Sequence, residues 1–248
     1  MLRDRLPGIA IDAPAAGCDI YEMGSGKVGL SVGSSVAVFD PGTSLLRYTA
    51  DVAPPILLTG SGRALALPNT SKDFLITLSR GTSCFFYAAA DAAPPEDIER
   101  LAASGMLNAR SAGAMLALHH IERPASPREY LEYSAQPICA TIARDAMCLS
   151  AERLGIRGEQ LFEVTAAVGE AVANAIEHCR HSTGATFTVD CAYGSGELYI
   201  HIESNGPWRA PELSDERGRG LPIMRAFTEA LEIASSQDRT RVSLSFAR

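Results

Sequence analysis

The chain has 248 residues, 29 acidic and 22 basic side chains and a net charge of -7, so it is long enough for two ordinary domains, each with its own core. An acidic excess provides no basic surface for the phosphate backbone, which excludes nucleic acid as a partner. No run approaches the ~18 consecutive apolar residues of a membrane-spanning helix, and the N-terminus lacks the apolar core of a signal peptide. We therefore expect a cytoplasmic protein that does not bind membranes.

The first half of the sequence, about residues 10 to 90, consists of short runs rich in β-branched and aromatic residues, with turn residues between them. Such runs are typical of β-hairpins and meanders. We expect strands at 27–32, 35–39, 45–49, 55–58, 74–78, 84–87 and 114–121. A helix is predicted after Pro94 and Pro95, because acidic residues there favour a first helical turn.

A polar segment with two prolines, 123–127, is the predicted linker between a domain at 1–122 and a domain at 128–248. Beyond it the apolar period becomes helical. We expect helices at 138–154, 160–179 and 221–229, and strands at 186–191, 197–203, 231–234 and 241–246. The fold class is therefore α+β: a mostly-β domain followed by a sandwich with helices on one face of a mixed, mostly antiparallel sheet.

A polar stripe runs along the second long helix, where Glu170, Asn174 and His178 follow one another at intervals of four residues. This spacing places them on one face of the helix. A carboxylate there can deprotonate a hydroxyl or a water, and an amide oxygen is a suitable ligand for Mg²⁺ beside phosphate oxygens. Taken alone, such a pair is more often a solvated polar stripe.

Two glycine-containing turns lie downstream of this helix. Arg217-Gly218-Arg219-Gly220-Leu221 runs directly into a short helix, and free amides at a helix N-terminus attract phosphate. Ser204-Asn205-Gly206-Pro207 ends a strand, where a base could pack. Alone, either segment is also compatible with an ordinary flexible loop.

Together these segments resemble the three motifs of GHKL (histidine-kinase-like) ATPase domains, in the order and spacing of the anti-sigma-factor serine kinases. The stretch 169–178 is similar to the N box, 204–209 to the G1 box and 217–221 to the G2 box. The resemblance implies ATP or ADP with Mg²⁺ as cofactor. It implies that Glu170 is the general base and Asn174 the Mg²⁺ ligand, and that the remaining residues contact the nucleotide: His178, Ser204, Gly206, Arg217, Gly218, Arg219, Gly220 and Leu221.

One position departs from that family. Its G1 box begins with an aspartate that accepts a hydrogen bond from the adenine amino group, whereas this sequence has Ser204. Loss of the charge-assisted bond weakens binding by about 1 to 2 kcal/mol, or roughly tenfold. The neighbouring Glu203 cannot substitute, because successive residues of a strand point to opposite faces.

The first half resembles a truncated, degenerate serine phosphatase of the sporulation stage II E type, within the protein phosphatase 2C superfamily. The stretch 17–22 is similar to the opening strand of that family, and 39–48 with 53–58 to a later hairpin. These enzymes hold two metal ions between carboxylates, but here Asp19 is the one expected acid that clearly remains, with Asp91 a displaced candidate. We expect no metal centre and no phosphatase activity in this half.

The resemblances imply a bacterial partner-switching regulator: a serine/threonine kinase of the anti-sigma-factor type fused to an inactive phosphatase-like domain. Its partners would be a sigma factor or an anti-sigma-factor antagonist. Loss of the phosphatase helices exposes sheet surface that a second copy of the chain could cover, so we expect a homodimer. The alternative is a binding module without enzymatic activity, in which both halves are degenerate and retain only their partner surfaces.

Overall fold

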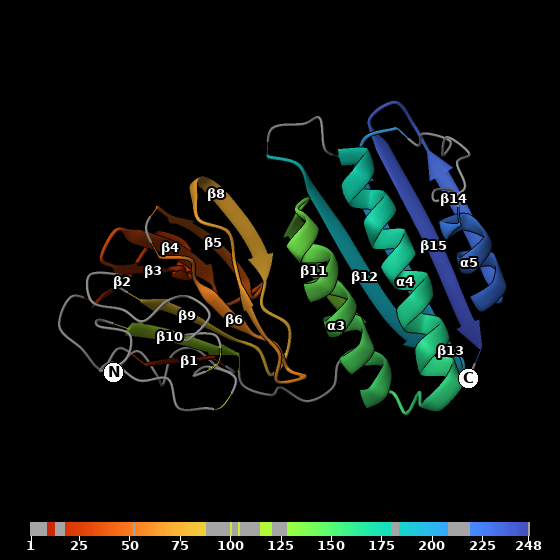
Figure 1. The fold of residues 1–248 in the computed structure, drawn as a ribbon, viewed down its shortest axis with the longest axis horizontal. Helices are drawn as coiled ribbons and strands as arrows, with labels where there is room; N and C mark the ends of the chain where they lie inside the picture. Colours follow the sequence, from red (N-terminus) through yellow and green to blue (C-terminus); the bar gives the residue numbers. More distant parts are fainter. Residues whose placement is uncertain are drawn as a thin grey trace. The chain divides into compact units, whose positions relative to one another are not determined.

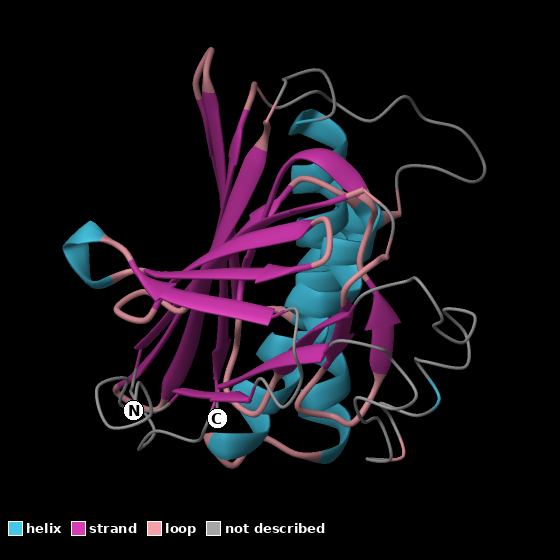
Figure 2. Cartoon of the chain, turned by 90° about the vertical axis from the view of Figure 1, so that its left-hand side faces the viewer, coloured by secondary structure: helices cyan, strands magenta, loops and turns pink. Residues whose placement is uncertain are grey.

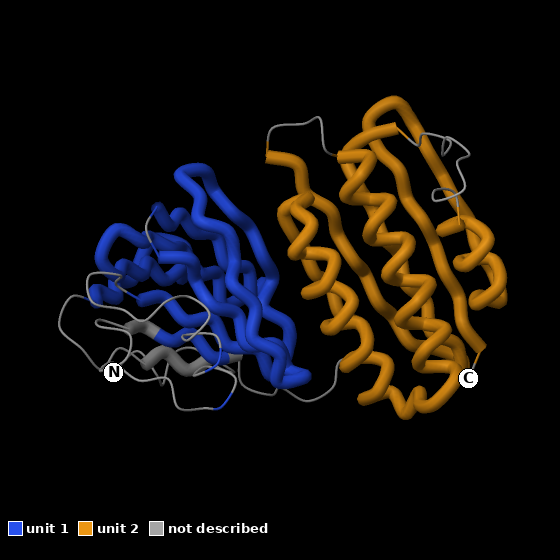
Figure 3. Tube along the Cα trace, viewed as in Figure 1, with its two compact units in different colours: residues 1–123 blue, residues 124–248 orange. Residues whose placement is uncertain are grey.

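The computed structural model divides the chain into two compact units, residues 1–123 and 124–248 (Figure 3). It describes the following residues: 9–12, 18–51, 53–87, 100, 104, 115–120, 128–179, 184–207 and 219–247. The helix predicted after Pro95 lies outside the described residues, as do Arg217 and Gly218.

Unit 1 is built from strands that form two antiparallel sheets (Figure 2). In the first sheet, neighbouring strands follow the order β2 (Cys18–Glu22), β3 (Val28–Val32), β4 (Ser35–Asp40), β5 (Leu45–Ala50) and β8 (Thr70–Thr77). In the second, the order is β1 (Ile9–Asp12), β10 (Met115–His120), β9 (Ser83–Tyr87), β6 (Ile56–Leu58) and β7 (Ala64–Ala66). The strand-rich organisation predicted for this half is confirmed.

Aromatic side chains join the two sheets of unit 1. The ring of Tyr48 on β5 lies 5.2 Å from the ring of Phe74 on β8 and 5.8 Å from the ring of Phe86 on β9, measured between ring centroids. Tyr48 is buried and its hydroxyl donates a hydrogen bond to the Pro68 carbonyl at 3.0 Å. The inward-facing residues of both sheets therefore form one apolar core.

Unit 2 is a sandwich in which three helices cover one face of an antiparallel sheet (Figure 1). The helices are α3 (Pro137–Arg153), α4 (Gly158–Cys179) and α5 (Gly220–Phe227). The strand order is β14 (Ala230–Ser235), β15 (Arg239–Ala247), β13 (Glu197–Asn205), β12 (Thr186–Gly194) and β11 (Arg128–Ser134). The predicted fold class is confirmed in this unit.

The sequence dictates where the two long helices begin and end. Pro137 starts α3, since proline lacks the amide hydrogen that the first helical turn leaves unbonded. Gly155, with a φ of 88°, follows the end of α3 in the left-handed conformation that glycine tolerates. Helix α4 buries a stripe of small and β-branched residues against the sheet: Val164, Ala167, Val168, Ala171, Val172, Ala175, Ile176 and Cys179.

Two of the differences from the prediction concern β11 and α5. Strand β11 occupies Arg128–Ser134, where the prediction had the chain pass from linker to helix. Only Leu131 and Tyr133 of this strand are buried, so its alternation is short and its apolar signal weak. Helix α5 ends at Phe227, two residues before the predicted end, and β14 follows almost at once.

Candidate functional site

The predicted polar stripe on α4 borders the sandwich core. Glu170, Asn174 and His178 are each partly exposed, while their neighbours Ala171 and Ala175 are buried against the sheet. Helix geometry and the burial of the opposite side therefore hold the three polar side chains along one edge of α4.

The first residue of α5 rests on this stripe. A β-carbon on Gly220 would lie 2.8 Å from Glu170 Oε2 and 3.6 Å from Asn174 Nδ2. Glycine is therefore the residue that lets the N-terminus of α5 approach the carboxylate and the amide so closely. The structure brings together Glu170, Asn174 and Gly220, which come from two separate sequence motifs.

The other end of the stripe meets the turn after β13. Gly206 has a φ of 147°, and a β-carbon there would lie 3.0 Å from the His178 carbonyl oxygen. The Gly206 amide donates to the Asp238 carbonyl at 2.9 Å, and its carbonyl accepts from Thr240 Oγ1 at 2.8 Å. These hydrogen bonds hold the turn to the residues at the start of β15, and the missing β-carbon of Gly206 lets the turn lie close to the C-terminal end of α4.

Ser204 faces the helices and is 3% exposed. It lies directly opposite Thr240 on β15, which in turn lies opposite Ser235 on β14. The Thr240 and Ser235 hydroxyl oxygens are 3.1 Å apart. Thr240 and Ser235 carry no signal in the sequence, because only the pairing register of β13, β15 and β14 places them in line with Ser204.

Cys179, the last residue of α4, lies beside the end of β13. Its thiol donates to the Asn205 carbonyl at 3.3 Å. Burial raises the pKa of this thiol, and hydrogen bonds with the Asn205 backbone and the Ser204 side chain act in the opposite direction. The thiol is therefore a neutral partner of the turn rather than a reactive thiolate.

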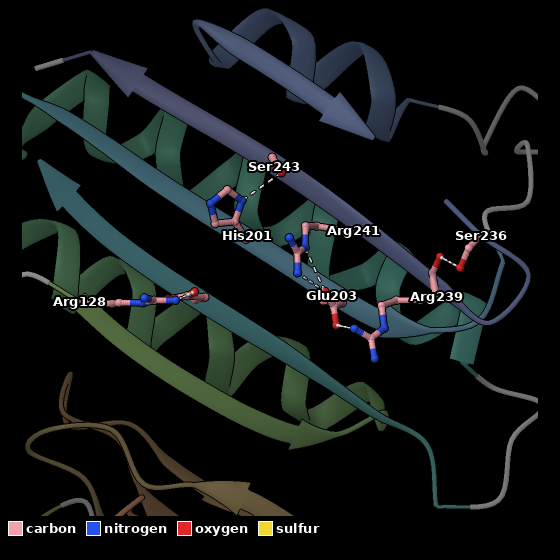
Figure 4. Close-up of polar contacts among 8 residues, drawn as sticks. Arg128, His201, Glu203, Ser236, Arg239, Arg241 and Ser243 are labelled. Carbon is pink, nitrogen blue, oxygen red and sulfur yellow. Dashed lines mark hydrogen bonds and ion pairs between the residues drawn. The ribbon is translucent and has the colours of Figure 1, made fainter. Parts of the chain in front are cut away.

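Glu203 points away from this corner, as strand alternation predicts. Its carboxylate pairs with Arg239 at 3.0 Å and with Arg241 at 2.6 Å on the face of the sheet opposite the helices (Figure 4). His201 and Ser243 share a hydrogen bond of 2.9 Å on that face, and Arg128 pairs with Asp190 there. Charge is thus concentrated on the face away from Ser204.

The remaining predicted residues stand as follows. Arg219 is the exposed residue before α5, and its carbonyl accepts from the Ile223 amide at 3.0 Å. Leu221 lies in the first turn of α5 and is half-buried. In unit 1, Asp19 is exposed on β2. No group of three or more His, Cys, Asp or Glu side chains that could hold a metal ion occurs among the residues that the structure describes.

The side chains at this corner are of the chemical type that a polyphosphate with Mg²⁺ requires. The Glu170 carboxylate and the Asn174 amide both lie beside Gly220, and each group carries an oxygen of the hard type that binds Mg²⁺. The N-terminus of α5 begins against them, and its amides present positive potential to an anion. These donors suit the group that the sequence motifs imply.

In the comparison with known proteins, residues 134–246 match the family model of the histidine kinase-like ATPase domain. The resemblance of the second half to GHKL ATPases is thereby confirmed. No curated protein matches the chain. Among solved structures, the chain is similar to the RsbU and RsbW domains of Rv1364c from Mycobacterium tuberculosis, with 19% sequence identity and a TM-score of 0.41 over 89% of this chain and 69% of that one. No described helix is long and apolar enough to cross a membrane.

Proposed function

We propose that the histidine kinase-like ATPase domain of unit 2 binds ATP with Mg²⁺ and phosphorylates a serine or threonine of a partner protein. The observation that carries this proposal is the meeting of Glu170, Asn174 and Gly220 at the N-terminus of α5. A base, a metal ligand and a phosphate-binding helix end are the parts that phosphoryl transfer requires.

Each residue has a defined role in this proposal. Mg²⁺, when bound, neutralises charge on the transferred phosphoryl group, and Asn174 supplies its side-chain oxygen to that ion. Glu170 accepts the proton of the attacking hydroxyl. The amides at the start of α5, with Arg219 beside them, hold phosphate oxygens. Ser204 and Gly206 form the end of the site where the base lies.

In the cell, the kinase would act as a partner-switching regulator in the cytoplasm, as a homodimer. The protein that it phosphorylates would be an anti-sigma-factor antagonist, and a sigma factor would be its other binding partner. This assignment follows from the likeness of the motifs at 169–178, 204–209 and 217–221 to those of anti-sigma-factor kinases. Sedimentation of the purified chain tests the dimer: a monomer at micromolar concentration contradicts it.

Unit 1 would act as an inactive phosphatase-like domain that carries partner surfaces. Its support is that Asp19, the retained acid, lies exposed on a strand, whereas a dinuclear centre needs several converging carboxylates. The full chain with Mn²⁺ should therefore release no phosphate from a phosphoserine peptide. Measurable release that Asp19→Asn abolishes would contradict this assignment.

Calorimetry with ADP and Mg²⁺ tests the nucleotide site on the wild type, Asn174→Ala and the control Ser243→Ala. We expect binding by the wild type and the control and at least tenfold weaker binding by Asn174→Ala, because the amide ligand is lost. Ser243 is a fair control because it lies on the opposite face of the sheet. Absence of binding by the wild type at millimolar nucleotide removes the kinase proposal.

The second candidate function is a binding module without enzymatic activity. Its support is Ser204, a neutral residue at the position where the G1 box of the anti-sigma-factor kinases begins with an aspartate. Transfer of labelled phosphate from ATP to a co-purified partner separates the two candidates. Transfer that Glu170→Gln abolishes supports the kinase, whereas partner binding that is indifferent to nucleotide and to Glu170→Gln supports the binding module.

A further inference from the structure

A pocket lies where the N-terminal end of α4 meets the C-terminal end of α5 and the end of β15. Its volume is about 240 Å³. Pockets that hold a whole small molecule measure roughly 300–1,000 Å³, so this one has the size for a single side chain. Its walls include Gln160 and Glu163 of α4, Phe227 of α5, Glu229 of the segment that follows, and Phe246 and Ala247 of β15.

Hydrogen bonds hold the walls of this pocket to the last strand. Gln160 Nε2 donates to the Ala247 carbonyl and so ties α4 to the end of β15. The Glu229 amide donates to the Ser245 carbonyl at 2.9 Å and so ties the segment after α5 to the same strand. The walls are therefore ordered without a partner, which lowers the entropic cost of binding one.

The pocket is acidic. Glu163 and Glu229 bring two carboxylates to its walls, and within the described part of the chain neither carboxylate takes part in an ion pair. Arg225, the cation in the last turn of α5, is not among the residues that line it. The carbonyl groups at the C-terminal end of α5 add negative potential. The pocket therefore attracts a positively charged group.

An aromatic pair stands beside the carboxylates. The rings of Phe162 and Phe227 lie 5.8 Å apart, edge to face. Phe227 lines the pocket, and Phe162 is 63% exposed, the highest value among the large apolar side chains that the structure describes. A guanidinium stacks on an aromatic ring as well as pairing with carboxylates, whereas an ammonium is a compact, strongly hydrated point charge. Arginine thus matches both the charge and the rings.

We infer that this pocket binds an arginine side chain presented by a partner protein, and that apolar residues beside that arginine cover Phe162. The contact lies at the end of α5 away from Gly220, which rests on Glu170. The partner and the site at Glu170 therefore use different ends of one helix. Arginine binding at Phe227 does not depend on nucleotide binding at Gly220.

The test is a ligand-observed NMR titration of the full chain with the blocked peptide acetyl-Gly-Leu-Arg-Leu-Gly-amide. The same peptide with lysine or glutamine in place of arginine serves for comparison. We expect the arginine peptide to bind at least about tenfold more tightly than the glutamine peptide, because its hydrogen bonds to carboxylates are charge-assisted. The lysine peptide should lie between them. Equal binding of the arginine and glutamine peptides overturns the inference, and so does absence of binding at millimolar arginine peptide.

Variants locate the contact. Glu163→Gln and Glu229→Gln should each weaken the arginine peptide at least about threefold, since each removes one partner of the guanidinium. Phe162→Ala should weaken the arginine and glutamine peptides by a similar factor, because it removes apolar contact area. Glu232→Gln is the matched control: it removes the same charge from an exposed residue of β14, opposite Ser243 on the sheet face away from the helices. Equal losses in the control and in the pocket variants would show an effect of net charge alone and would overturn the inference.

Discussion

Gly206 and Gly220 each approach α4 closely, but the atoms they face differ. Gly206 faces a backbone oxygen, that of His178, and has a positive φ. Gly220 faces the tip of a flexible side chain, that of Glu170. A substitution at the first position must therefore strain the backbone, whereas at the second the neighbour can move.

Gly206→Ala should lower the free energy of unfolding by about 1–3 kcal/mol, since the new β-carbon strains both φ and the contact with His178. Urea denaturation measures the loss. Gly194→Ala is the matched control, because a β-carbon at Gly194 meets nothing within 4 Å, and it should change stability by less than about 0.5 kcal/mol. Equal losses in the two variants would show that the Gly206 contact has no special role.

Gly220→Ala should leave stability within about 1 kcal/mol of the wild type, because the Glu170 carboxylate can swing aside. The displaced carboxylate should nevertheless lower phosphate transfer at least tenfold, with the ADP dissociation constant changed less than threefold, if Glu170 is the base. Transfer assays beside calorimetry check this split. Full transfer by Gly220→Ala would remove Glu170 from the role of base.

At the scale of elements, side chains on the two faces of strands β13 and β15 contribute unequally to the free energy of unfolding. Thr240→Val removes a buried donor to the Gly206 carbonyl and should lower the free energy of unfolding by about 1–2 kcal/mol. Glu203→Ala removes two exposed ion pairs and should cost less than about 1 kcal/mol. Chemical denaturation of both variants in low salt measures the two losses; a larger loss for Glu203→Ala contradicts this ranking.

Much of unit 2 could be predicted from sequence because its elements are long and periodic. The stripe of α4 and the alternation of β13 and β15 each repeat over several turns or pairs. Strand β11 could not be predicted, since only Leu131 and Tyr133 face the core. Contacts of Ser204 with Thr240 and Cys179 depend on strand register and helix docking, which no local pattern encodes.

At the scale of the whole molecule, the six cysteines are free and four of them are buried. Burial raises the pKa of Cys139 and of Cys191 to about 12 each, and raises that of Cys84 as well. Native protein at pH 8 should therefore react with iodoacetamide at Cys18 and Cys148, the two half-buried thiols. Mass spectrometry counts the labels; rapid modification at Cys139 would contradict this assignment.

The same thiols set a limit on alkaline stability. Their pKa values are higher in the folded chain than the 9.0 of an ordinary thiol, so the unfolded chain releases these protons first as pH rises. The contribution of the buried thiols is present below pH 9 and is lost between about pH 9 and 12. Denaturant midpoints measured across this range should fall, and should fall less for Cys191→Ala.

Thr240 joins the end of β13 to the next two strands of the sheet: it lies opposite Ser204, its hydroxyl donates to the Gly206 carbonyl at 2.8 Å, and its oxygen lies 3.1 Å from the Ser235 hydroxyl on β14. One buried side chain on β15 thus couples three strands. Local opening at this edge of the sheet should therefore release the three strand ends together, as one cooperative unit, rather than strand by strand.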